Sequence, residues 1–429
     1  MGGGLAGSEA AWALAERGVR VRLVEMRPVA TTPAHRTDRL AELVCSNTFK
    51  STETTNAHGL LKAELRLLGS LLLPVADQAR VPGGSALAVD REVFSRLVTE
   101  RVAGHPRIEL VREEAVALPE PGVVATGPLT SDALARVLET AAGTGALAFY
   151  DAIAPIVSAD SLGTGRLFRA SRYGKGGGAD YWNAPLSRDD YGAFVAALTA
   201  ADRYPGHDFD AAPYFEGCLP VEEMAARGGE TLRFGPMKPV GLVDPRSGRE
   251  PYAAVQLRQE DRAAQMWNLV GFQTRLRTGE QQRVFRMIPG LEQAEFLRYG
   301  SIHRNSYLNA PRCLDAHLAL VGRPRTLVAG QLTGVEGYTE SLGTGLLAGL
   351  NLARMLRGAA ALTPPRETML GSLVAWVHGA EPGSFQPMNA NFGLLPPLEQ
   401  PPRDKAKKKQ LLAGRALAAM AAFAREIAA

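Results

Sequence analysis

The glycine-rich start of the chain constrains the fold most. Residues 2–7 read Gly-Gly-Gly-Leu-Ala-Gly, which matches Gly-x-Gly-x-x-Gly, and residues 8–16 continue with helix-forming residues. From Gly18 to Val24 the chain then alternates apolar and polar residues, as a β-strand does, before it reaches Glu25. Glycines let the backbone approach a pyrophosphate, and an acid at the end of the next strand can accept hydrogen bonds from a ribose.

This order of turn, helix, strand and acid predicts a nucleotide site in a parallel sheet, whereas a glycine pattern alone would be weak evidence. The alternative is a tight turn that binds no ligand. The residues predicted to contact the nucleotide are Gly2, Gly3, Gly4, Leu5, Ala6, Gly7 and Glu25.

A strand normally precedes such a glycine turn and lies at the centre of the sheet, but only Met1 precedes it here. Without that strand, the neighbouring strands would lose backbone hydrogen-bond partners in the core, and leaving those groups unpaired is costly. We therefore expect the natural chain to begin several residues before Met1, with an apolar strand.

A second glycine-rich region lies far downstream. Residues 326–330 have the pattern of a buried strand, Gly334 and Glu336 follow it, and residues 341–349 are expected to open a helix. Such a segment can hold a ribityl chain and direct a helix N-terminus at a flavin, so the pair of regions favours FAD over NAD. The Ala-Thr-Gly turn at residues 125–127 resembles a segment that often closes the same kind of site. The further predicted cofactor contacts are Gly127, Gly330, Gly334, Glu336, Thr344 and Gly345.

Length and composition are those of an ordinary globular protein. A chain of 429 residues exceeds the roughly 250–300 residues that one core usually supports, so we expect two domains or one large discontinuous domain. No apolar run reaches the roughly 18–20 residues of a membrane span, and we expect a cytoplasmic protein with no membrane partner. The net charge of +4 is compatible with a polyanionic partner and equally with a solvated surface. Three cysteines are too few for a disulfide framework, and we predict no metal site.

Six motifs together resemble one family. They are Gly-Gly-Gly-Leu-Ala-Gly-Ser-Glu-Ala-Ala at 2–11, Leu-Val-Glu-Met-Arg-Pro at 23–28, Val-Cys-Ser-Asn at 44–47, Phe-Gly-Pro-Met-Lys-Pro-Val-Gly-Leu at 234–242, His-Arg-Asn-Ser-Tyr-Leu-Asn at 303–309 and Gln-Pro-Met-Asn-Ala-Asn at 386–391. The chain resembles the bacterial folate- and FAD-dependent tRNA uracil-5-methyltransferases over nearly its whole length, apart from the first strand and the tail beyond about Pro401. The larger FAD proteins that modify the wobble uridine of tRNA share the opening motif, but they carry a long C-terminal region for which this chain has no room.

The resemblance implies a reaction and its partners. FAD would be reduced by NADH or NADPH, methylenetetrahydrofolate would supply a methylene group, and carbon 5 of the T-loop uridine of tRNA would receive it to form ribothymidine. The expected partners are tRNA and folate, and no protein partner is predicted. One alternative is a non-catalytic or differently specific FAD-containing tRNA-binding protein related to the wobble-uridine enzymes. Another is an FAD oxidoreductase that acts on a small molecule.

The resemblance also assigns roles to three side chains. Cys218 matches a family cysteine that attacks carbon 6 of uracil, and Cys45 matches a second one on the flavin side, although the two roles could be exchanged. A thiolate suits this attack because it adds readily and leaves again. His303 matches the family imidazole that stacks on the pterin. Without the resemblance, each would be interpreted as a packing or hydrogen-bonded residue, as we interpret Cys313.

The order of predicted elements gives an α/β architecture. A Rossmann-like FAD-binding domain with a parallel sheet would comprise residues 1–170 and 306–355, an inserted α+β domain residues 171–305, and a helical C-terminal extension residues 356–429. Within these parts we expect helices at 187–202, 366–378 and 410–428, and strands at 234–241, 252–258 and 267–272. Residues that could contact tRNA are Arg172, Lys175, Lys238, Arg258 and Arg304, with Tyr173, Tyr181 and Trp182 as possible stacking partners.

Overall fold

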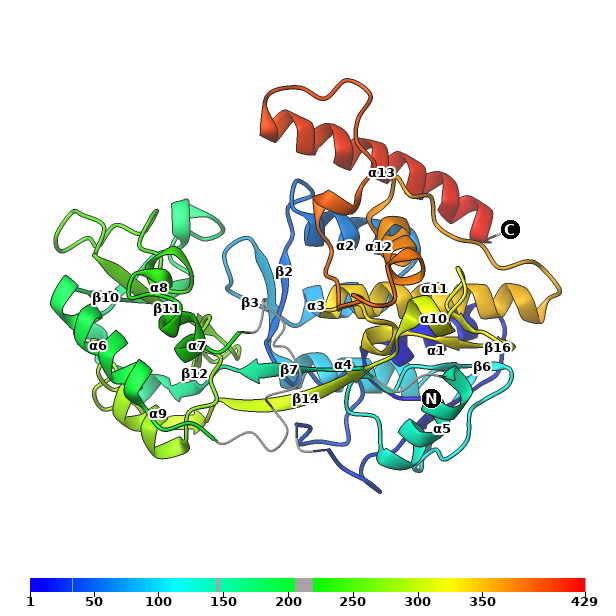
Figure 1. Ribbon diagram of the computed structural model, residues 1–429, viewed down its shortest axis with the longest axis horizontal. Helices are drawn as coiled ribbons and strands as arrows, with labels where there is room; N and C mark the ends of the chain where they lie inside the picture. The colour runs from blue at the N-terminus through cyan, green and yellow to red at the C-terminus, as the bar shows by residue number, and fades with distance from the viewer. Residues whose placement is uncertain (33, 144–146, 205–218, 429) are drawn as a thin grey trace.

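Two lobes joined by a pair of long strands make up the molecule (Figure 1). The structure is a computed structural model that describes residues 1–32, 34–143, 147–204 and 219–428, with only the backbone of residues 147–151, 303 and 304. The second lobe comprises the described residues between 156 and 298, and the first lobe contains the rest, apart from the connecting strands. Each lobe has its own hydrophobic core. The connecting strands are β7 (Leu147–Ile153) and β14 (Ser301–Tyr307), which pair antiparallel.

The first lobe contains most of the helices. Its helices are α1 (Leu5–Glu16), α2 (Ala57–Leu67), α3 (Leu72–Gln78), α4 (Arg91–Ala103), α5 (Asp132–Ala142), α10 (Ala310–Cys313), α11 (Tyr338–Leu356), α12 (Met369–Gly379) and α13 (Lys405–Ala428). Its strands are β1 (Val21–Glu25), β2 (Thr48–Ser51), β3 (Arg80–Val81), β4 (Ala86–Val89), β5 (Ile108–Arg112), β6 (Gly122–Val124), β15 (Ala319–Leu320) and β16 (Arg323–Val328).

Parallel strand pairs meet at the glycine turn. β1 pairs with β5 and β6 pairs with β16, both in parallel, which confirms the predicted α/β class. The backbone of the first two residues lies between these pairs, because the Gly2 amide donates to the Val24 carbonyl at 2.8 Å and the Ala125 amide donates to the Met1 carbonyl at 2.9 Å. The turn therefore lies where the two parallel pairs meet, and β1 ends beside it in Glu25.

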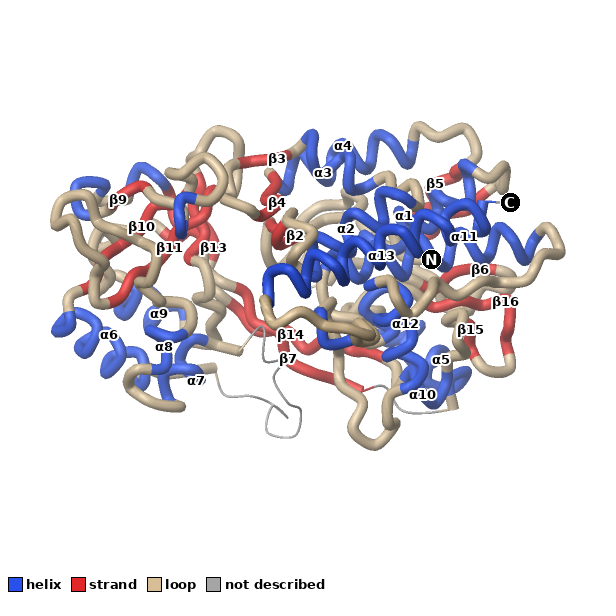
Figure 2. Tube along the Cα trace, turned by 90° about the horizontal axis from the view of Figure 1, so that it is seen from above, coloured by secondary structure: helices blue, strands red, loops and turns tan. Residues whose placement is uncertain are grey.

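Helices α1 and α11 cross at very short range behind this turn (Figure 2). A Cβ at Gly345 would run into the backbone of Ala6, and one at Gly349 would lie 2.6 Å from the carbonyl oxygen of Ala10. Only glycine permits this approach, which fixes the start of α1 against the second glycine-rich segment.

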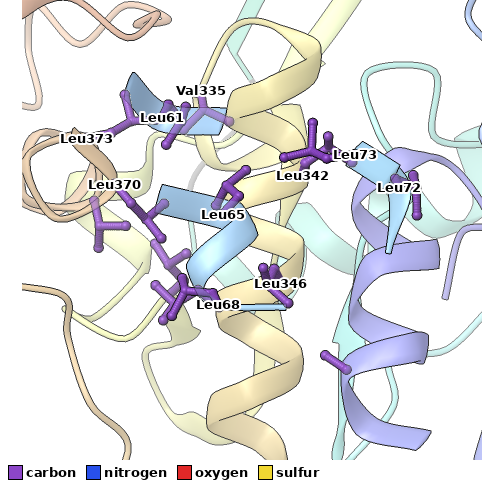
Figure 3. Packing of buried hydrophobic residues seen from close by; sticks show 14 of the residues in the cluster. Leu61, Leu65, Leu68, Leu72, Leu73, Val335, Leu342, Leu346, Leu370 and Leu373 are labelled. Atoms are coloured by element: carbon purple, nitrogen blue, oxygen red, sulfur yellow. The ribbon is translucent and has the colours of Figure 1, made fainter. Parts of the chain in front are cut away.

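The C-terminal helices pack onto the first lobe. Leu65 of α2, Leu346 of α11 and Leu370 of α12 belong to one buried cluster, and Figure 3 shows such leucines pointing toward one another. Helix α13 lies along α2. The predicted helices at 366–378 and 410–428 are confirmed as α12 and α13, and both contribute to the core of the first lobe.

The second lobe is built on an antiparallel sheet. Its strands are β8 (Ile156–Ser158), β9 (Phe168–Arg169), β10 (Tyr181–Leu186), β11 (Ala253–Gln259), β12 (Met266–Leu269) and β13 (Phe296–Arg298), in the order β13-β8-β12-β11-β10-β9. Its helices are α6 (Arg188–Ala200), α7 (Val221–Ala226), α8 (Thr231–Phe234) and α9 (Thr278–Phe285). Because β8 and β9 belong to this sheet, the sheet begins before residue 171, where the sequence placed the start of the inserted domain.

Most predicted elements of the second lobe are present. The helix at 187–202 and the strands at 252–258 and 267–272 are confirmed as α6, β11 and β12. The predicted strand at 234–241 is wrong, because helix α8 ends at Phe234 and turns follow it. Proline removes backbone donors at 236 and 239 there, and the positive φ of Gly241 reverses the chain. In the described part of the chain, no helix combines the length and the apolar composition needed to cross a membrane.

Buried carboxylates cap two helices of the first lobe. Glu9 accepts hydrogen bonds from the Leu71 and Leu72 amides at the start of α3. Glu64 accepts from the Met369 amide at 2.7 Å and the Leu370 amide at 2.9 Å at the start of α12. Both side chains are fully buried. Burial outweighs these hydrogen bonds and raises the pKa of Glu64 from 4.5 to about 8.

This raised pKa predicts a pH-dependent loss of stability. The folded state holds the Glu64 proton more tightly than the unfolded state, so the contribution is fully present below the unfolded pKa and is lost as the pH rises toward about 8. Between about pH 6 and pH 8, the free energy of unfolding of the wild type should fall relative to that of Glu64→Gln by about 1 kcal/mol per pH unit. Chemical denaturation across this pH range measures the difference. Parallel curves would contradict the prediction, and Glu109→Gln, at an exposed position on β5, is the control.

Candidate functional site

A groove lies over the glycine turn of the first lobe. It encloses about 1040 Å³, part of it open to solvent, at the upper end of the size of typical cofactor pockets. Seven of the predicted cofactor residues line it, namely Gly2, Gly4, Leu5, Ala6, Glu25, Gly127 and Gly330. The structure thus brings together residues from the start, the middle and the end of the first lobe.

The glycines of the turn have different roles. A Cβ at Gly4 would meet no atom within 4 Å, so this residue leaves the groove open at the start of α1. Gly2 and Gly7 pack tightly instead, since a side chain at Gly2 would collide with the backbone of Ala125 and one at Gly7 with the backbone of Gly2. Gly4 is also the N-cap of α1 and has no side chain to cap the first amides of the helix. An anion in the groove could accept these amides and benefit from the helix dipole.

Glu25 is a buried carboxylate at the edge of the groove. Its Oε2 accepts the Gly3 amide at 2.7 Å, and its Oε1 accepts Nε of Arg27 at 2.7 Å and the Arg27 amide at 3.0 Å. Burial alone would raise the pKa of Glu25, but the hydrogen bonds and the charge of Arg27 outweigh it and hold the pKa below its usual value. Glu25 is therefore ionised, and Oε2 retains acceptor capacity for a hydroxyl of the ligand.

Of the cofactor residues predicted in the downstream segment, Gly330 alone lines the groove. Thr344 is buried, and its hydroxyl accepts the Gly330 amide at 2.9 Å, so it positions that glycine from behind. Gly345 packs against α1, and Gly334 packs against the ring of Phe385. The side chain of Glu336 accepts a hydrogen bond from Gln331. None of these four is among the groove-lining residues. For Thr344 and Gly345 the reason is that α11 begins at Tyr338, so the expected helix start at 341 lies inside it.

Tyr338 lines the groove and was not among the predicted site residues. Its hydroxyl accepts the amides of Cys45 and Ser46 at 3.1 and 3.0 Å, and it donates to the Ser46 carbonyl at 2.9 Å. These partners lie 292 and 293 residues away in sequence, so no local pattern could reveal the contact. Arg27, Thr32, His35 and Gln331 line the groove as well and were also not predicted.

Two guanidinium groups hold the segment around Cys45 from another side. Arg91 donates to the carbonyl oxygens of Leu43 at 3.1 Å and Cys45 at 3.2 Å. Arg298, from the second lobe, donates to the Val44 carbonyl at 2.5 Å. Both guanidinium groups interact electrostatically with the Cys45 thiol, and cationic neighbours of this kind favour a thiolate.

The other residues with predicted roles are only partly described. Cys218 lies within residues 205–218, outside the described part of the chain. The backbone of His303 lies in β14 and pairs with Asp151, but its side chain is outside the described residues. Cys313 is buried and its Sγ donates to the Asn309 carbonyl, and burial raises the pKa of its thiol to about 11. It is a packing residue, as predicted.

Several side chains that were predicted to contact tRNA form hydrogen bonds or ion pairs with other parts of the protein. Arg258 is only 7% exposed and donates to the side chains of Asn47 and Ser46. Lys175 pairs with Glu53 at 2.7 Å. Arg172 donates to the backbone of the 238–240 segment, whereas Tyr173 is 63% exposed. The side chain of Arg304 lies outside the described residues.

Comparison with known proteins finds a matching family and similar proteins of full length. The family described as glucose inhibited division protein A matches residues 1–360. A protein of Geobacter sulfurreducens is 60% identical over 420 residues, which cover 97% of this chain and 96% of the relative. A protein of Syntrophomonas wolfei is 54% identical over 429 residues, covering 100% of this chain and 98% of the relative. Both are named methylenetetrahydrofolate--tRNA-(uracil-5-)-methyltransferase TrmFO.

A solved structure has the same fold. GidA of Aquifex aeolicus, in its form II crystal, superposes with a TM-score of 0.72 over 99% of this chain and 72% of that chain, at 15% sequence identity. At this identity the likeness concerns the fold alone. The family match covers most of the chain, and the sequence identity to the two relatives extends over nearly its whole length. The chain therefore belongs to the glucose inhibited division protein A family and, within it, to the TrmFO methyltransferases.

Proposed function

We propose that this protein methylates carbon 5 of the T-loop uridine in tRNA, with FAD as cofactor and methylenetetrahydrofolate as the one-carbon donor. The geometric observation that carries the proposal is the double role of Tyr338, which lines the groove and also holds the backbone of Cys45. A thiol segment thus borders a groove built for a dinucleotide. The 60% identity to a protein named for this reaction supports the same function. The cytoplasm, where tRNA is modified, is the proposed location.

The residues of the groove fit FAD. The open position at Gly4 and the uncapped start of α1 would hold the pyrophosphate, and Glu25 would accept the ribose hydroxyls. Gly330 and Tyr338 would lie toward the flavin end. When bound and reduced by NADH or NADPH, FAD supplies the reducing equivalents that turn a methylene group into a methyl group.

The two cysteines and the histidine would handle the substrates. Carbon 5 of uracil is a poor nucleophile until a group adds to carbon 6, so the Cys218 thiolate would form a bond to carbon 6 and thereby make carbon 5 attack the methylene. Loss of the carbon 5 proton and cleavage of the bond between the methylene group and the folate nitrogen, with tetrahydrofolate as the leaving group, would leave a methylene group on carbon 5. A hydride from the reduced flavin would then convert this group to methyl as the thiolate leaves carbon 6 and the ring double bond forms again. Cys45, next to Arg91 and Arg298, would act on the flavin side, and His303 would stack on the pterin.

One assay separates this proposal from its rivals. Purified protein with FAD, NADPH and labelled methylenetetrahydrofolate should transfer label into unmodified tRNA, and digestion should recover the label in ribothymidine. A non-catalytic tRNA-binding flavoprotein would bind the tRNA without transferring label. An oxidoreductase for small molecules would consume reductant without needing tRNA or folate. Absence of labelled ribothymidine with flavin-loaded protein would refute the proposed function.

The placement of FAD predicts the effect of a substitution at Gly4. A Cβ at this position would meet no protein atom within 4 Å, and φ is −73°, so the backbone accepts a side chain without strain, but the side chain of valine would occupy the proposed pyrophosphate position. We expect Gly4→Val to fold but to bind FAD at least about tenfold more weakly. A tenfold weaker affinity corresponds to a loss of about 1.4 kcal/mol of binding free energy. The absorbance of the flavin relative to that of the protein measures this. Gly279→Val, at an exposed position in the first turn of α9 where a Cβ also meets open space, should keep normal flavin content, and a fully yellow Gly4→Val variant would contradict the placement.

The roles of the cysteines predict different behaviour toward a trapping substrate. Fluorine at carbon 5 blocks the proton loss that releases the enzyme, so tRNA with 5-fluorouridine should stay covalently attached to the attacking thiol. Cys45→Ala should still form an adduct that survives denaturing electrophoresis, whereas Cys218→Ala should form none. Both variants should lose methylation. The opposite adduct pattern would exchange the two roles, and methylation retained in both variants would exclude the mechanism.

A further inference from the structure

The first two turns of α13 carry an exposed cluster of lysines. Residues 405–411 are all exposed, whereas Leu412 and Ala413 are buried, so the helix extends beyond the part of it that packs on the first lobe. At a rise of about 1.5 Å per residue, this overhang is about 10 Å long. The basic surface consists of its four lysines, Lys405, Lys407, Lys408 and Lys409.

Nearby acidic residues do not neutralise the basic surface. Residues 396–411 contain five basic residues and two acidic ones, Glu399 and Asp404, which leaves a net charge of +3. Oδ1 of Asp404 caps the helix, because it accepts the amides two and three residues further on, at 2.7 and 3.3 Å. In the part of the chain that the structure describes, Lys175 forms an ion pair with a carboxylate, whereas none of the four lysines does.

The position of these lysines opposes the stability of the helix. The N-terminal end of a helix carries a partial positive charge, so cations in the first turn are disfavoured and acids are favoured. The first turn of α13 contains no acidic residue, although Lys405, Lys407 and Lys408 are three of its first four residues. Residues that oppose the local structure are expected at functional sites, and an anionic partner would offset the cost of these cations.

Two of the lysines continue the buried stripe of α13. Positions 405, 409, 412, 416, 420, 423 and 427 follow one another at spacings of three or four residues, which places them along one face of the helix. From 412 onward the side chains of this face are buried in the core of the first lobe. At 405 and 409 the same face carries lysine instead. The overhang therefore presents Lys405 and Lys409 on the side of the helix that is turned toward the first lobe.

A short series of contacts connects the basic surface to the groove. Nζ of Lys409 lies 5.8 Å from the centre of the Phe392 ring. Two residues before Phe392, the Ala390 amide donates to the Glu340 carboxylate at 2.9 Å. Glu340 is in the first turn of α11, two residues after Tyr338, which lines the groove. The basic surface thus lies at the end of the first lobe where α11 begins and the groove is bordered.

The orientation of α13 agrees with this placement. Arg354, near the end of α11, donates to the carbonyl of Glu426 at 3.2 Å, so the C-terminal ends of α11 and α13 lie together. The first turns of α13 are at its other end, which is the end nearer the second lobe in Figure 1. Lys50 is exposed and lies within electrostatic range of Glu340, so it adds a cation near the start of α11.

We propose that the basic surface binds the phosphate backbone of the tRNA whose T-loop uridine enters the groove. This inference rests on the proposed function, which supplies the tRNA. Lysines suit this role, because contacts to phosphates position a nucleic acid without reading its sequence. Anionic lipids also present phosphates. The lysines at 405 and 409 are turned toward the first lobe, however, where a strand of RNA can follow them and a flat bilayer cannot.

The test compares two variants that lose the same charge. The lysine variant combines three changes in the basic surface, namely Lys405→Gln, Lys408→Gln and Lys409→Gln. The control variant combines three changes at exposed positions elsewhere on the first lobe, namely Arg20→Gln, Arg101→Gln and Arg136→Gln. The dissociation constant of the FAD-loaded full chain for unmodified tRNA is measured by filter binding between about 50 and 200 mM salt.

The lysine variant should bind tRNA at least about tenfold more weakly at about 100 mM salt. Its slope of log Kd against log salt should be flatter by about two, since each lost phosphate contact lowers the slope by about 0.7–0.9. The control variant should bind as the wild type does. Replacing the same three lysines with arginine should preserve the affinity, because the charge is kept.

Methylation and unfolding separate weaker binding from damage to the protein. The KM of the lysine variant for tRNA should rise, whereas its kcat at saturating tRNA and its flavin content should equal those of the wild type, because none of the lysines lines the groove. Its unfolding temperature should be unchanged or higher, because the helix dipole no longer opposes three cations.

The outcomes that would overturn the inference are distinct. Unchanged tRNA affinity in the lysine variant, or an equal loss in the control variant, would refute the basic surface as a tRNA contact. Unchanged tRNA affinity together with lost binding to vesicles that contain phosphatidylserine would assign the basic surface to a membrane. In each of these cases the wild type still methylates tRNA, so the proposed function stands. A wild type that neither binds nor methylates tRNA would refute the proposed function, and this inference with it.

Discussion

The contact between α1 and α11 is the constraint on which the rest of the first lobe depends. Because Gly345 and Gly349 have no side chains, the backbones of the two helices meet directly at Ala6 and Ala10. This contact places the start of α1 beside Gly330, whose amide is held by Thr344 in the second turn of α11. The pyrophosphate end and the flavin end of the proposed site thus belong to one rigid unit, although more than 300 residues of chain separate them.

The sequence predicted those parts of the site that local patterns encode. The glycine turn, the following helix and the strand ending in Glu25 form a continuous segment with its own periodicity, and all three are present. Tyr338 could not be found in this way, because its partners Cys45 and Ser46 are distant in sequence. A local sequence motif does not distinguish this tyrosine from the others in the chain. Thr344 and Gly345 were predicted to contact the cofactor, but the helix begins earlier than expected and both residues pack inside the protein. The failed strand at 234–241 shows that apolar residues interleaved with Pro and Gly also fit a series of turns.

Net charge proved a poor guide to where the basic residues act. A net charge of +4 is compatible with a polyanionic partner and equally with a solvated surface, yet Arg27, Arg91 and Arg258 are engaged with carboxylates, amides or backbone carbonyls inside the protein. Each holds a segment that borders the groove. These arginines act as cross-links between loops, because a planar guanidinium can satisfy several backbone carbonyls and a carboxylate together. A composition count cannot distinguish such a cross-link from a solvated charge.

The paired strands β7 and β14 carry both chain connections between the lobes. Ile153 lies opposite Ser301 in this ribbon, so the chain leaves the first lobe and returns to it at neighbouring positions. If a short turn joined Ile153 to Ser301, the chain of the first lobe could follow the same course, since an insertion whose ends lie together leaves the host fold undisturbed. The second lobe is thus a module that evolution can enlarge, trim or exchange, and the nucleotide-binding fold beneath it can serve different substrates.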